Sequence, residues 1–136
     1  MVDDLFDLLL ARARSAAFAD DGHQRGWDAV RLAALLRKEG RLDDALRLLD
    51  DVVERFPYPD VESAAYACAV AIHCDAGRPG TGIRVGREVW ERSRNAELGS
   101  ALARAYWERA EETGDPLDRD AWAAFGKQLE AAQPAA

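Results

Sequence analysis

The stretch "RKEGRLDDALRLLDDVVERFP", residues 37–57, decides the fold of this chain. From Leu42 to Phe56 its apolar residues recur at i, i+3 and i+4, a spacing that predicts an amphipathic helix. Gly40 lies just before this pattern and Pro57 ends it. Glycine adopts the left-handed conformation that other residues resist, whereas proline cannot continue the helical hydrogen bonds. The stretch therefore predicts two helices joined by a turn at Gly40, the second of them closed by Pro57.

The glycine turn recurs along the chain. Gly40, Gly77 and Gly114 are each separated from the next by 37 residues, and each follows a long helical pattern and precedes a shorter one. A fixed period in this range is typical of supersecondary units stacked side by side. No segment shows the alternation of apolar and polar residues that a half-buried strand requires. We therefore expect an all-α chain of stacked helical hairpins.

The other helix boundaries are predicted from polar capping residues, from proline at a first helical position and from glycine at an end. An N-terminal helix is expected over residues 1–20 and a loop over residues 20–26. The second helix is expected from about Trp27 to Glu39, and the third is the one described above from Leu42 to Phe56. A fourth helix would be capped by Asp60 and extend to Ala76, and a fifth would be capped by Thr81. A sixth is expected between Asn95 and Gly114, and a seventh starts at Asp115 and Pro116.

The composition indicates a soluble globular protein of one domain. Of its 136 residues, 49% are hydrophobic and 32% charged. The net charge of −7 at pH 7 argues against nucleic acid or an anionic membrane as the main partner, because both require a basic surface. No run approaches the roughly 20 apolar residues of a membrane span. The apolar run over residues 5–11 follows aspartates rather than the basic residues that begin a signal peptide.

The two cysteines favour a reducing compartment. Cys68 and Cys74 are six residues apart in one expected helix. A rise of about 9 Å and a rotation of about 600° separate their thiols, which puts them beyond disulfide reach. We therefore expect no bridge between them and a cytoplasmic location.

A family resemblance follows from residues 26–59. The small Ala45 is followed four positions later by the large Leu49, and Pro57 closes the unit after the turn at Gly40. This pattern resembles the tetratricopeptide repeat. In the first unit Leu32, Ala33 and Leu36 occupy the family's packing positions, whereas Ala29 replaces its usual aromatic residue. In the second unit Tyr66 occupies that aromatic position, but Gly82 and Gly86 replace the small and the large residue. The third unit has an Ala121/Phe125 pair if two residues are inserted.

The resemblance implies a right-handed α-solenoid. Its parts would be three tetratricopeptide-like hairpins over residues 26–59, 60–94 and 96–132, with the helix over residues 1–20 covering the N-terminal end, which gives seven helices in total. The period of 37 exceeds the family's usual length of about 34 by nearly one helical turn. The extra residues can therefore lengthen a helix while almost preserving its facing.

The resemblance also implies a non-enzymatic protein-interaction module, an adaptor or regulator. In this family the first helices of the hairpins form an inner wall that binds an extended or helical peptide. The groove positions transferred to this chain are Trp27, Val30, Arg31, Ala34, Arg37, Ala64, Ala67, Cys68, Ala71, Cys74, Ala101, Arg104, Ala105, Glu108 and Glu111. The alternative reading is that the alanines and cysteines only fill helices and that the arginines are ordinary solvated charges.

No residue pattern predicts catalysis, a cofactor or a metal site. His73 and Cys74 are adjacent, so their directions on a helix diverge by about 100°, whereas helical ligand pairs need i, i+3 or i, i+4 spacing. The chain has no phosphate-binding glycine loop and no nucleophile motif. We expect a protein or peptide partner and neither nucleic acid nor membrane.

A second hypothesis is a self-assembling homodimeric module. Trp90, Trp107 and Trp122 lie towards the C-terminal end of the expected solenoid, where no polar capping helix follows. An uncovered solenoid end is a natural surface for a twofold partner.

Overall fold

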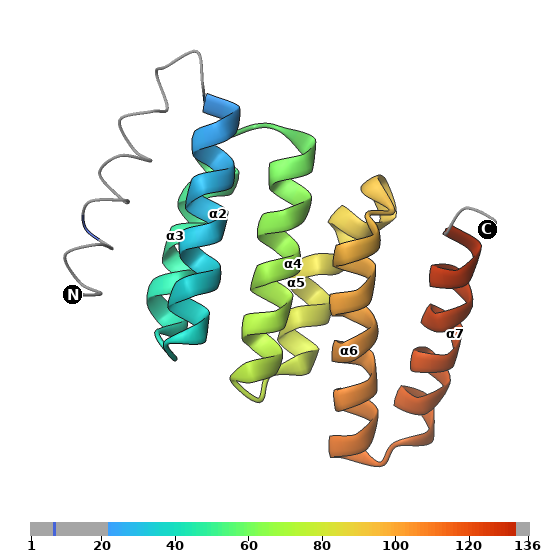
Figure 1. Ribbon diagram of the computed structural model, residues 1–136. Coiled ribbons are helices and arrows are strands. Elements are labelled where there is room, and N and C mark those ends of the chain that lie inside the picture. The colour runs from blue at the N-terminus through green and yellow to red at the C-terminus, as the bar shows by residue number, and fades with distance from the viewer. Residues whose placement is uncertain (1–6, 8–21, 133–136) are drawn as a thin grey trace. The chain divides into compact units, whose positions relative to one another are not determined.

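The structure, a computed structural model, describes Asp7 and residues 22–132, and in this part every regular element is a helix (Figure 1). The expected all-α class is therefore confirmed, whereas the expected helix over residues 1–20 lies, apart from Asp7, outside the described residues. In the same part, no helix combines the length and the apolarity needed to cross a membrane. The six helices are α2 (Gly22–Lys38), α3 (Leu42–Arg55), α4 (Pro59–Asp75), α5 (Pro79–Ser93), α6 (Ala96–Thr113) and α7 (Pro116–Ala132).

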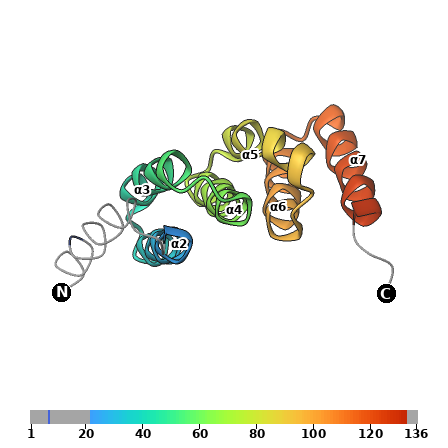
Figure 2. The same ribbon diagram turned by 90° about the horizontal axis from the view of Figure 1, so that it is seen from above.

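The chain divides into two compact units, Met1–Ala65 and Tyr66–Ala136, and the boundary falls inside α4. In the first unit α2 packs against α3. In the second unit α6 packs against both α5 and α7, and lies between them (Figure 2). This packing of adjacent helices is consistent with a helical repeat.

All three predicted turn glycines are confirmed. Gly40, Gly77 and Gly114 have φ angles of 78°, 76° and 65°, which lie in the left-handed region. A side chain there would strain the backbone, so glycine allows each helix to end and the chain to reverse. Each turn also satisfies free carbonyl groups at the helix end, as where the amide of Arg41 donates to the carbonyl of Leu36 at 2.8 Å.

The hairpin of α2 and α3 buries the apolar face that the sequence pattern predicts. The two small and two large residues that match the packing positions of the tetratricopeptide repeat are all almost fully buried. They are Ala33, Leu36, Ala45 and Leu49. The rest of this buried set is Ala29, Val30, Leu32, Leu48, Val52 and Phe56.

The predicted loop over residues 20–26 is wrong from Gly22 onwards, because α2 begins there rather than near Trp27. The added turns are held by tertiary contacts instead of by apolar periodicity. Gly26 packs so closely that a Cβ atom on it would lie 3.0 Å from Val61 and 3.1 Å from Phe56. A contact between segments this far apart in the sequence overrides the weak helix propensity of a glycine-containing stretch.

Asp60 lies in the first turn of α4, so its predicted role as the capping residue is wrong. Its carboxylate instead connects α4 to α2. The Nε2 atom of His23 lies 2.6 Å from Oδ2 of Asp60, and Nε1 of Trp27 donates to the same oxygen at 3.1 Å. The hydrogen bond with His23, reinforced by that of Trp27, holds the pKa of Asp60 below its ordinary value.

The predicted starts are confirmed at two of the three remaining helices. α6 begins after Asn95, as predicted, and the structure adds that Asn95 caps it, since its side chain accepts a hydrogen bond from the amide of Leu98 at 3.0 Å. Asp115 accepts from the amide of Leu117 at 2.9 Å, where Pro116 begins α7. The prediction for α5 is wrong by three residues, because its N-cap residue is Arg78 and not Thr81. Proline at the first position starts that helix at Pro79, ahead of the threonine that the sequence favoured.

The core of the second unit forms around Trp90, which is 1% exposed. Its indole contacts the ring of Phe125, with centroids 5.4 Å apart. Gly86 of α5 lies where a Cβ atom would come within 2.6 Å of Val70, so the missing side chain lets the backbone of α5 approach α4 closely. The other buried members of this core include Ile83, Val89, Leu98, Leu102, Ala105 and Tyr106.

Candidate functional site

The structure places the fifteen predicted groove residues in three classes of exposure. Exposed positions are Arg31, Ala34 and Glu111. Half-buried positions are Trp27, Arg37, Cys68, Ala71, Ala101, Arg104 and Glu108. Buried positions are Val30, Ala64, Ala67, Cys74 and Ala105. Those on α2, together with Ala64, belong to the first unit, and the others on α4 and α6 belong to the second. The buried five offer almost no side-chain surface to a partner.

In the first unit, two of the predicted groove side chains bind neighbouring carboxylates. The indole of Trp27 donates to Asp60, as described above. Arg31 lies 3.5 Å from Asp28 and its side chain is 69% exposed. An exposed pair of this kind stabilises a helix by less than about 1 kcal/mol, so the guanidinium of Arg31 is accessible to other carboxylates.

In the second unit, Arg104 joins α4 to α6. Its guanidinium donates from Nη2 to Oδ1 of Asp75 at 2.9 Å and from Nε to Oε1 of Glu108 at 3.1 Å. Partial burial acts to lower the pKa of Arg104, but the hydrogen bonds to Asp75 and Glu108 outweigh it and raise this pKa above its ordinary value. The side chain therefore serves the fold and is not free to bind a partner.

Cys74 lies next to this ion-pair network and is unsuited to nucleophilic chemistry. Burial, together with the hydrogen bond and the negative charge of Glu108, raises the pKa of its thiol to about 12. A thiol with that pKa is almost entirely protonated at neutral pH, whereas the thiolate is the nucleophile and the metal ligand. No disulfide joins Cys68 and Cys74.

Among the described residues, no group of three or more His, Cys, Asp and Glu side chains is placed to hold a metal ion. His73 is half-buried, and its Nδ1 atom lies 3.4 Å from Nη2 of Arg78.

Two tryptophans form an exposed aromatic pair on α6 and α7. Trp107 is 45% exposed and Trp122 is 37% exposed, and their rings lie 4.8 Å apart. The expectation that Trp90 shares this exposed end is wrong, because Trp90 lies in the core. A third exposed apolar residue, Leu117, begins α7 and is 74% exposed.

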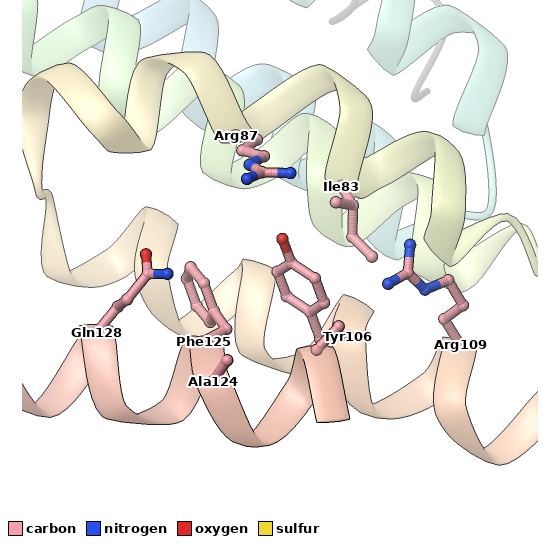
Figure 3. Close-up of a pocket in the computed structure, with 8 residues that line it drawn as sticks. Ile83, Arg87, Tyr106, Arg109, Ala124, Phe125 and Gln128 are labelled. Atoms are coloured by element: carbon pink, nitrogen blue, oxygen red, sulfur yellow. The ribbon is translucent and has the colours of Figure 1, made fainter. Parts of the chain in front are cut away.

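A pocket of about 270 Å³ opens between α5, α6 and α7 (Figure 3). The rings of Tyr106 and Phe125 form its floor and stack with centroids 4.9 Å apart and an interplanar angle of 25°. Arg87 on α5 and Arg109 on α6 lie at its sides. The remaining lining residues are Ile83, Ala121, Ala124 and Gln128.

Similarity to known proteins does not favour any one of these surfaces as the functional site. Comparison of the chain with protein-family models, with curated proteins and with solved structures finds no match. The tetratricopeptide resemblance therefore stays a hypothesis that depends on the repeated pattern.

The pocket was not predicted from the sequence, since none of its lining residues is among the fifteen groove positions. Those positions were transferred from the inner wall of a solenoid, whereas the pocket lies where α5 and α7 flank α6. One signal was present in α7. Ala121 and Ala124 are small residues three apart beside Phe125, which leaves space next to an aromatic ring.

Proposed function

We propose that this chain is a non-enzymatic protein-interaction module that binds a segment of another protein. In this proposal the hairpins form a right-handed, tetratricopeptide-like solenoid, and the partner binds the side on which α4 and α6 carry the predicted groove residues.

The observation that supports this proposal most is the exposure of Trp107. Arg104, Trp107 and Glu111 are spaced three and four residues apart, so they share one face of α6. Tryptophan is enriched among the residues that contribute most to binding energy at interfaces, and a half-exposed indole gains by being covered. The predicted groove face on α6 thus has an aromatic anchor beside an exposed carboxylate.

Capture from a cell lysate with the purified chain as bait tests the proposal. A specific partner is expected to be retained by the wild type and lost with Trp107→Ala or Glu111→Arg. The matched control is Glu112→Arg, because Glu112 is equally exposed but points about 100° away around α6. Equal capture by all four proteins would remove this face from the proposal. Arg104→Glu is unsuitable as a probe, since it breaks the ion pair with Asp75.

A second candidate function is self-assembly into a homodimer, and the Trp107–Trp122 pair supports it. Together with Leu117, this pair places three exposed large apolar side chains on the last two helices. Light scattering at micromolar concentration is expected to give the mass of a dimer, and Trp122→Ala the mass of a monomer. A monomeric wild type at those concentrations would contradict this candidate while leaving the first one intact.

A further inference from the structure

The pocket between α5, α6 and α7 combines an aromatic floor with a basic lining. Among the described residues that line it, Arg87 and Arg109 are the only charged ones and none is a carboxylate. The pocket is therefore locally positive, although the whole chain has a net charge of −7. Charge of one sign in a concave site favours a ligand of the opposite sign.

The size and floor of the pocket fit one apolar side chain. At about 270 Å³ it lies just below the range of about 300–1,000 Å³ that is usual for sites of small molecules and cofactors. The faces of Tyr106 and Phe125 are buried against the core, and the hydroxyl of Tyr106 points towards the α5 wall (Figure 3). Because these rings are almost fully buried, an aliphatic or aromatic side chain in the pocket would remove further apolar area from water mainly by covering Ala124 and the aliphatic stems of Arg87 and Gln128, which are exposed.

Arg109 connects the pocket to a second, shallower hollow. This hollow has a volume of about 540 Å³ and is also lined by Arg78, Arg84 and Glu112. Because Arg109 lines both hollows, a chain segment that inserts one side chain into the pocket would continue past Arg84. Four arginines and one glutamate thus lie along the combined surface.

Arg87 and Arg109 already contact carboxylates, and the contact at Arg87 leaves room for a ligand. Arg87 pairs with Glu91 at 3.3 Å, but both side chains are more than half exposed, so a ligand carboxylate can replace or share this weak pair. Arg109 is fixed more firmly, by Asp118 at 3.1 Å and by the ring of Tyr106, whose centroid is 5.3 Å from its Cζ atom. Its Nε atom is buried and, despite the short distance to Asp118, lacks a hydrogen bond of good geometry.

We propose that this pocket is a second protein-binding site, which accepts an acidic peptide segment with one apolar anchor residue. The anchor packs on Tyr106 and Phe125, and the flanking carboxylates bind Arg87 and Arg84, while Arg109 stays paired with Asp118 between the two hollows. The site is separate from the face that carries Trp107. Arg109 and Trp107 point about 200° apart around α6, so the two surfaces lie on different sides of this helix.

Fluorescence anisotropy with labelled seven-residue peptides tests this site on the full chain. The peptides carry three glutamates on each side of a central leucine, phenylalanine or alanine, and a parallel set carries lysines instead. The leucine and phenylalanine peptides with glutamates are expected to bind at least about tenfold more tightly than the alanine peptide and than every lysine peptide. Added salt is expected to weaken this binding.

Two variants of exposed alanines on α7 provide the matched comparison. Ala124→Glu places a negative charge in the pocket and is expected to weaken binding at least about tenfold, whereas Ala123→Glu adds the same charge outside it and changes the affinity less than about twofold. Trp107→Ala is expected to leave peptide binding unchanged, which separates this site from the proposed function. Equal affinities for the leucine and alanine peptides, equal effects of the two glutamate variants, or no binding by the wild type would each overturn the proposal.

Discussion

Trp90→Ala is expected to lower the free energy of unfolding by about 3–5 kcal/mol. The side chain is 1% exposed and contacts the ring of Phe125. Gly99 fits against the edge of the same indole, since a Cβ atom on it would lie 2.8 Å from Cζ3. Neighbours arranged this closely around a large ring relax only partly into the cavity left by alanine. Urea unfolding followed by far-UV circular dichroism measures the loss.

The control for this prediction is Trp107→Ala. Trp107 lies in the next helix of the same unit but is 45% exposed, so its removal is expected to cost less than about 1 kcal/mol. A loss for Trp107→Ala as large as for Trp90→Ala would show that the two indoles are buried alike, and it would contradict the core described here. Because typical domains are stable by only about 5–15 kcal/mol, the Trp90 variant is also expected to unfold at a much lower temperature.

The features that the sequence predicts well are those with local causes. Gly40, Gly77 and Gly114 each end a helix in the left-handed region, and this preference belongs to glycine itself. Asn95 caps α6 through a hydrogen bond to a residue three positions later. Such signals need no knowledge of distant segments, so the sequence alone locates the three turns and the starts of α6 and α7.

The features that the sequence predicts poorly depend on contacts between distant segments. The early start of α2 depends on Gly26 meeting Phe56 and Val61, which lie about 30 residues or more along the chain. Trp90 and Trp107 both occur in helical patterns, and only the neighbouring helices decide which of them is covered. The basic pocket is missed for the same reason, because it forms only where α5 and α7 flank α6.

The predicted groove shows what a family pattern can predict and what it cannot. It marks positions on α4 and α6 that the structure does bring together, as the hydrogen bond between Cys74 and Glu108 demonstrates. It does not tell which of those side chains are already used by the fold. Arg104 and Cys74 occupy groove positions, yet one is committed to an ion pair and the other is buried with a protonated thiol.

Gly86→Ala is expected to lower the free energy of unfolding by about 1–3 kcal/mol, although alanine is the better helix former. Its Cβ atom would lie 2.6 Å from Cγ2 of Val70, and Leu102 and Leu98 follow at 3.2 and 3.3 Å. Val70 is fully buried and its branched side chain has few alternative rotamers, so it cannot move aside cheaply. The gain of about 1 kcal/mol in helix propensity is therefore smaller than the cost of forcing α5 away from α4.

Gly126→Ala provides a matched control because its expected effect has the opposite sign. Gly126 lies inside α7, and a Cβ atom there would meet no other atom within 4 Å. Alanine at this position is expected to raise the free energy of unfolding by about 0.5–1 kcal/mol, since it restricts the unfolded chain without crowding the folded one. If both variants were stabilised alike in urea unfolding, helix propensity alone would account for them. The close approach of α5 to α4, on which the shape of the second unit depends, would then be wrong.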